Sequence, residues 1–123
     1  MPLLNVLDVI WIQDEFIRPP GPKMVVCVAP DLGLFFRINS RPHPIAVTLD
    51  CTVNTFLKHD SFLECTAPLE LDDYVIEAFL DRHGAPFGTV VASVVPDIGR
   101  AVRQSQRISA ADRIAILTAL GLQ

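Results

Sequence analysis

Four consecutive residues in the middle of the chain carry four different reactive groups. Lys58, His59, Asp60 and Ser61 offer an amine, an imidazole, a carboxylate and a hydroxyl. Imidazole gives and takes protons near neutral pH, so this segment is suited to general acid–base chemistry. The same residues equally suit a plain turn, in which Asp60 or Ser61 holds the loop backbone. Both interpretations stay open at this level.

A second polar group stands where a hydrophobic run ends. The group lies at the end of an apolar run and leads into a proline-rich loop. Its members are Arg37, Asn39, Ser40 and Arg41. Strand ends beside loops often carry functional groups, because a rigid scaffold then positions an exposed side chain. The alternative is the ordinary polar surface of a hairpin end.

The familiar signatures of nucleotide and metal sites are missing from the sequence. It contains no glycine-rich nucleotide motif and no paired-histidine metal motif, and its three histidines and three cysteines are scattered. We therefore expect no metal and no cofactor. Cys27 lies in an apolar run and is expected to be a small core residue. Three cysteines without close spacing favour free thiols in a reducing compartment, which predicts a cytoplasmic protein.

Composition limits the class of protein further. The 123 residues suffice for one domain, residues 1–123, and 50% of them are hydrophobic, which excludes intrinsic disorder. No apolar run is long enough to span a membrane. The net charge of −4 argues against a general nucleic-acid binder, although four arginines between residues 97 and 113 leave a local basic stripe possible. The high apolar content predicts burial against a second copy.

Short runs of β-branched and aromatic residues alternate with loops rich in proline and glycine over most of the chain. Such runs are typical of short antiparallel strands. We expect strands over residues 6–12, 24–29, 34–39, 45–49, 62–71 and 88–93. Residues 18–23, with three prolines and a glycine, predict a loop.

The last third of the chain is predicted to be mainly helical. A short helix is expected over residues 71–80, and a helical tail over about 95–121. In that tail, Ser109 is a typical N-cap, with Asp112 three residues later, and Gly121 is a typical C-terminal stop. The buried stripe of its first helix is predicted to be Ile98, Ala101, Val102 and Ser105. The apolar face of its second helix is predicted to be Ile114, Leu117 and Leu120.

Five to seven short antiparallel strands with C-terminal helices give a mainly β, β-rich α+β fold, either a bent sheet or a small barrel.

The order of these elements resembles the PemK/MazF-like toxin family, the growth inhibitors of toxin–antitoxin pairs. The resemblance rests on residues 7–12 as the opening strand, 21–26 as the entry to the second, and 36–40 as the third with its small polar end. Residues 58–65 and 88–90 are similar to later parts of the family pattern, and residues 109–121 to its final helix.

The resemblance implies an SH3-like β-barrel, a homodimer and an antitoxin partner. It also implies cleavage of single-stranded RNA without a metal. In this chain it places Lys23 where the family has an arginine, and Ser40, or Asn39 in a register shifted by one, where the family has a hydroxyl residue. Lysine keeps the charge but lacks the two-pronged geometry that matches phosphate.

Two hypotheses follow for the function. In the first, the chain is an endoribonuclease with Lys23, Ser40 and His59 as catalytic residues and with RNA contacts from Asn39, Arg41 and Lys58. In the second, the same barrel is a non-catalytic binding module, either a degenerate toxin relative or a phage or plasmid accessory protein. The acidic balance of the chain favours the second, whereas the polar residues at strand ends favour the first.

Overall fold

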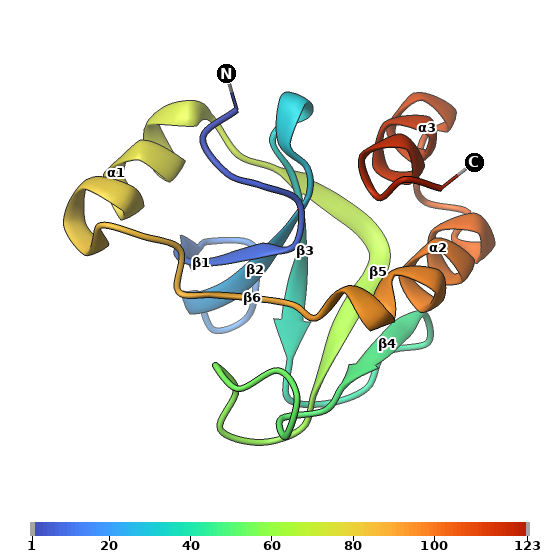
Figure 1. The fold of residues 1–123 in the computed structure, drawn as a ribbon, viewed down its shortest axis with the longest axis horizontal. Coiled ribbons are helices and arrows are strands. Elements are labelled where there is room, and N and C mark those ends of the chain that lie inside the picture. The colour runs from blue at the N-terminus through green and yellow to red at the C-terminus, as the bar shows by residue number, and fades with distance from the viewer. Residues whose placement is uncertain (1, 123) are drawn as a thin grey trace.

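The structure, a computed structural model, describes residues 2–122 and is mainly β with three helices (Figure 1). The six strands are β1 Asp8–Asp14, β2 Gly21–Ala29, β3 Leu34–Asn39, β4 Ala46–Leu49, β5 Ser61–Glu70 and β6 Gly88–Thr89. The three α-helices are α1 Asp73–His83, α2 Val95–Gln104 and α3 Ala110–Ala119. Two short 3-10 turns, Pro30–Leu32 and Ala92–Val94, connect elements.

All six strands form one antiparallel sheet that curls into a half-barrel. The strand order is β4-β5-β3-β2-β1-β6, so β4 and β6 are the two edges. Every pairing joins antiparallel neighbours, and the register shifts once within β2–β3 and once within β3–β5. Such irregularities bend strands and increase their twist, which accounts for the curl.

The sheet has a different apolar core on each face, as the alternation of side chains along a strand requires. Helices α2 and α3 cover one face, and α1 covers part of the other (Figure 1). Under α2 and α3 the core contains Val26, Val28, Phe36, Ile38, Leu63, Ile98 and Ile116. Under α1 it contains Ile10, Ile12, Val25, Cys27, Phe35, Ile76 and Phe79.

Several local predictions are confirmed in the helical tail. The Ser109 hydroxyl accepts a hydrogen bond from the Asp112 amide at 3.1 Å, and Gly121 has a φ of 75°. The four residues of the predicted stripe are all buried, three on α2 and the fourth, Ser105, at its C-cap. The predicted face of α3 is wrong at Ile114, which is 66% exposed, because α3 buries Ile116 against the sheet instead.

Two strand predictions differ from the structure. Residues 18–23 were expected to form a loop, yet β2 begins at Gly21, which pairs with Asp14 of β1. Pro22 is tolerated there because the β2–β3 ladder begins only at Val25. The last strand is also shorter than expected, since only Gly88 and Thr89 pair with β1 before the chain turns into a helix.

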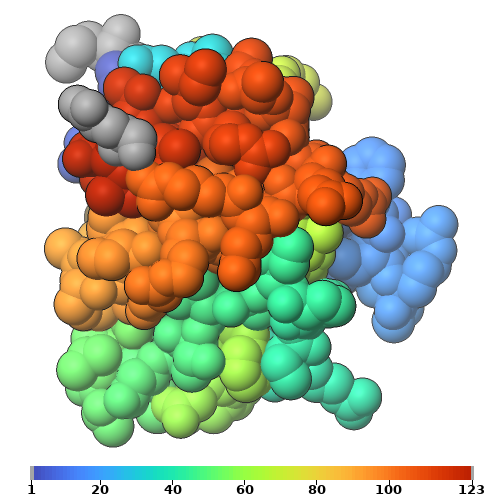
Figure 2. Space-filling model, turned by 90° about the vertical axis from the view of Figure 1, so that its right-hand side faces the viewer, coloured from blue at the N-terminus to red at the C-terminus, as the bar shows by residue number. Residues whose placement is uncertain are grey.

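Within residues 2–122, no helix combines the length and apolar character that crossing a bilayer needs. Figure 2 shows the side where the orange and red C-terminal helices lie above the green segment that includes β4, with the β1–β2 loop projecting in blue.

Candidate functional site

Polar side chains occupy the end of the sheet face that α1 leaves uncovered. Side chains on one face alternate along each strand, so Lys23 shares a face with Val25, and Arg37 and Asn39 share it with Phe35. The register then brings Arg37 opposite Glu64 of β5. We call the group formed here the polar cluster. Its members are Asp14, Lys23, Arg37, Asn39, His43 and Glu64.

Asp14 and Arg37 form the most buried ion pair of this cluster. The Arg37 Nε donates to Asp14 Oδ2 at 2.5 Å, and a guanidinium nitrogen approaches Asp14 Oδ1 at 3.4 Å. The Asp14 side chain is only 1% exposed. Burial alone would raise the pKa of Asp14. Hydrogen bonds from Arg37 and the Phe16 amide, together with the positive charges of Arg37 and Lys23, outweigh burial and lower that pKa.

Glu64 connects the end of β3 to the loop that follows it. The Asn39 side-chain amide donates to Glu64 Oε1 at 2.8 Å, and His43 Nε2 lies 3.6 Å from the same oxygen. Asn39 is buried, whereas the Glu64 and His43 side chains are 22% and 42% exposed. The carboxylate is therefore held in place by a buried amide and faces an imidazole at the surface.

Lys23 is the cation of the cluster for which no hydrogen bond or ion pair is described within residues 2–122. It is partly buried on β2. Burial lowers the pKa of Lys23, and the charge of Arg37 lowers it further, while Glu64 and Asp14 raise it; the net pKa lies below the ordinary value. An ammonium group in this position is poorly solvated, so an added anion would stabilise it strongly.

His59 lies in a different environment. It lines a pocket of about 200 Å³, the aromatic pocket, whose walls are Trp11, Met24, Phe56, Leu57, Lys58, His59, Ser61 and Phe87. Met24 packs against the core under α2 and α3, so the strand directs it to the face opposite Lys23. No described contact within residues 2–122 joins His59 to Lys23. The pocket is hydrophobic, with Trp11 and Phe87 packed edge-to-face at 5.8 Å between ring centroids.

The predicted acid–base segment makes the contacts of a turn. His59 Nδ1 lies 2.8 Å from the Asp60 carbonyl oxygen, and the Ser61 hydroxyl donates to the His59 carbonyl at 3.1 Å. Asp60 accepts from the Cys51 amide at 2.9 Å, which ties the two ends of the loop together. Lys58 is exposed beside His59.

Of the two positions considered at the end of the third strand, Asn39 lies on the face of the polar cluster. It is the last residue of β3 and shares that face with Arg37. Ser40 and Arg41 are exposed in the following loop.

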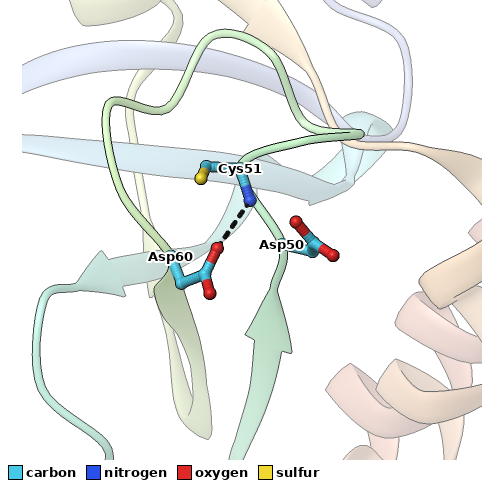
Figure 3. A group of neighbouring side chains, drawn as sticks. All are labelled: Asp50, Cys51 and Asp60. Carbon is cyan, nitrogen blue, oxygen red and sulfur yellow. Dashed lines mark hydrogen bonds between the residues drawn. The ribbon is translucent and has the colours of Figure 1, made fainter.

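Asp50, Cys51 and Asp60 bring three possible metal ligands within 4.8 Å of one another (Figure 3). The two carboxylates already hold the loop, since Asp50 accepts from both the amide and the hydroxyl of Thr52, and Asp60 accepts from the Cys51 amide. A hydrogen bond with Asp60, burial and the nearby carboxylates raise the pKa of Cys51. The hydrogen bonds that these two carboxylates accept account for the group as a closure of the loop.

The prediction from sequence lacked three members of the polar cluster: Asp14, His43 and Glu64. Asp14 shares the buried parity of Ile10 and Ile12 in an alternating run, where an acid is a usable signal. Glu64 alternates with the buried Leu63 and Cys65, so its position carries no such signal. His43 carries no such signal, because only the path of the loop after β3 brings it near Glu64.

No protein-family model matches this chain, and no match was found among curated proteins or solved structures.

Proposed function

We propose that the chain is a PemK/MazF-like toxin relative with an SH3-like barrel, and that its polar cluster cleaves single-stranded RNA without a metal. One observation carries the proposal: Lys23 and Asn39 lie on the same end of one sheet face. Lys23 is the first strand position that the resemblance singles out, and Asn39 is the alternative to Ser40 for the second, in the register shifted by one. Arg37 lies opposite Val25 of β2 and Glu64 of β5, and Glu64 accepts a hydrogen bond from Asn39.

The cluster contains the groups that such a cleavage requires. The ribose 2′-oxygen attacks the neighbouring phosphorus, the bond to the 5′-oxygen breaks, and a cyclic phosphate and a free 5′-hydroxyl result. Glu64 takes the proton from the 2′-hydroxyl, and protonated His43 returns one to the leaving oxygen. Lys23 balances the extra negative charge that develops on the phosphorane.

The remaining predicted residues have secondary roles in this proposal. Ser40 and Arg41 border the cluster from the loop after β3 and would contact the RNA backbone. Lys58 and His59 lie at the aromatic pocket, and a catalytic role for His59 remains a prediction from the sequence. A homodimer and an antitoxin partner complete the proposal.

The test is cleavage of a long single-stranded RNA in EDTA by purified protein. The wild type should cut it, and Lys23→Ala should lower the rate by about 100-fold or more, because one charge-stabilising group is lost. Arg82→Ala removes the same charge from the exposed end of α1 and should leave the rate unchanged. Full activity in Lys23→Ala would refute the role of Lys23.

The second candidate, a non-catalytic binding module, is favoured by a specific observation. Arg37 is already paired with Asp14, and Glu64 already interacts with both Asn39 and His43, so most of the cluster is internally compensated. This candidate predicts no RNA affinity even at low salt, where phosphate contacts are strongest. Binding of RNA that weakens as salt is added, with loss in Lys23→Ala, would exclude it.

A further inference from the structure

The aromatic pocket is held open by contacts within the chain. Three rings in its wall form a chain of edge-to-face contacts, Trp11 with Phe87 at 5.8 Å and Phe56 with Phe87 at 6.3 Å between ring centroids. The Phe56 ring rests on the backbone of Gly88, where a Cβ would lie 2.6 Å from the Phe56 Cγ. Because the rings are already fixed in this way, a ligand that enters the pocket loses little energy to ordering its wall.

The volume of the pocket sets the size of the ligand. The aromatic pocket measures about 200 Å³. An apolar cavity of about 150 Å³ holds a benzene molecule, so this pocket has room for a single ring with a short substituent. The rings in the wall favour an aromatic occupant over a saturated one of the same size, since aromatic pairs gain energy beyond the area that they bury.

Charge at the pocket selects an anion. Lys58 lines it, is exposed, and has no described hydrogen bond or ion pair within residues 2–122. The other basic residue in the wall is His59, and of the described residues that line the pocket none carries a carboxylate. Asp60, which is close in sequence, accepts a hydrogen bond from the Cys51 amide at 2.9 Å (Figure 3). A ligand carboxylate therefore meets the Lys58 ammonium without displacing a described partner.

We propose that the aromatic pocket binds a small aromatic carboxylate, with its ring against Trp11 and Phe87 and its carboxylate beside the Lys58 ammonium. An exposed ammonium next to an apolar wall matches a ligand that is apolar at one end and singly charged at the other. The proposal does not involve the polar cluster and stands apart from the proposed function.

The polar groups of the pocket disfavour a nucleotide base, another planar ring. The edge of a base carries several hydrogen-bond donors and acceptors, which are costly to bury without partners. The Ser61 hydroxyl already donates to the His59 carbonyl at 3.1 Å, and His59 Nδ1 lies 2.8 Å from the Asp60 carbonyl oxygen. A phenyl ring has no polar edge, so it makes no demand on these groups.

Trp11 provides a direct measurement of binding. It is the one tryptophan of the chain and it lines the pocket, so its fluorescence reports occupancy. The probe is phenylacetate, titrated into the full chain at low salt, where exposed charges are least screened. Phenylacetamide has nearly the same shape without the charge, cyclohexylacetate keeps the charge without the aromatic ring, and uridine monophosphate supplies a base.

Two variants accompany these probes. Lys58→Met removes the proposed partner of the carboxylate and keeps an unbranched side chain. Arg107→Met is the matched control, because it removes an exposed cation that does not line the pocket. The phenylacetamide probe tests the role of charge on the unaltered chain, independently of whether Lys58→Met folds.

Phenylacetate should change the Trp11 fluorescence in a saturable way. Phenylacetamide, cyclohexylacetate and the Lys58→Met substitution should each weaken binding about threefold or more, whereas Arg107→Met should bind phenylacetate as the wild type does. The proposal is overturned by no saturable change with phenylacetate, by equal binding of phenylacetamide or cyclohexylacetate, or by equal effects of Lys58→Met and Arg107→Met. Tighter binding of uridine monophosphate than of phenylacetate would overturn it as well.

Discussion

Asp14 is the residue on which the local geometry of the polar cluster depends most. Its carboxylate accepts from the Phe16 amide at 3.0 Å and from Arg37, so it connects the β1–β2 loop to β3. The pair is not an ordinary surface contact, since the Asp14 side chain is almost fully buried. Loss of the charge leaves Arg37 without its anion inside the protein, which is costly.

Asp14→Asn should therefore lower the free energy of unfolding by about 2 kcal/mol, which is less than for a fully buried pair because Arg37 is partly exposed. Denaturant unfolding measures the change. The matched control is Asp97→Asn, which breaks the exposed pair with Arg100 and should cost no more than about 0.5 kcal/mol. Equal effects of the two substitutions would contradict the importance of burial here.

The same residue predicts how stability depends on pH. The folded-state pKa of Asp14 lies below its ordinary value of 3.8. A group with a lowered pKa stabilises the folded state above its unfolded-state pKa, and this contribution is lost as the pH falls through the folded-state value. The stability difference between wild type and Asp14→Asn should thus be constant near neutrality and shrink below about pH 4. A stability difference that grows on acidification would contradict a lowered folded-state pKa for Asp14.

Lys23 is expected to support RNA cleavage while it lowers the stability of the folded state. Because burial and the charge of Arg37 lower its pKa, the folded state bears a cost for its ammonium group. Lys23→Met is expected to abolish RNA cleavage and to raise the free energy of unfolding by about 1 kcal/mol, since an apolar side chain replaces a desolvated charge. Thermal unfolding together with the cleavage assay checks both. A strong loss of stability in Lys23→Met would mean that Lys23 stabilises the folded state.

At the level of elements, the turn into β3 depends on a glycine. Gly33 has a φ of 63°, and a Cβ at this position would lie 2.6 Å from the Leu71 carbonyl oxygen. Gly84 at the end of α1 also has a positive φ, but nothing lies within 4 Å of its Cβ position. Gly33→Ala should cost about 3 kcal/mol and Gly84→Ala about 1 kcal/mol, because only the first adds a clash to the backbone strain. Urea unfolding of the two variants provides the comparison, and equal losses would contradict it.

The strands and caps could be predicted because their signals are local. The apolar and aromatic run in residues 34–39 and the serine at position 109 lead directly to β3 and to the start of α3. Strand pairing is not local, and so the polar cluster was only partly predictable. Lys23 and Asn39 were singled out individually, whereas Glu64 joins them through the β3–β5 register, which includes an irregularity between Phe35 and Arg37. The face of α3 was mispredicted at Ile114 for the same reason, since the docking angle of a helix depends on its neighbours.

At the scale of the whole molecule, the surface retains large apolar side chains. Trp11, Phe16, Tyr74, Phe87 and Ile114 are among those exposed. Their number agrees with the high hydrophobic content of the chain, from which the homodimer was predicted. Light scattering at micromolar concentration should give twice the mass of 13.6 kDa. A single-chain mass under those conditions would contradict dimerisation.

In the proposed function, the polar cluster cuts RNA through the ribose 2′-hydroxyl. The most direct measurement compares two strands of identical sequence in EDTA, one all-ribose and one with every 2′-hydroxyl methylated. The account predicts that wild-type protein cuts only the all-ribose strand, and that Glu64→Gln cuts neither because the group that takes the 2′-proton is gone. Failure to cut the all-ribose strand, or equal cutting of both strands, would contradict it.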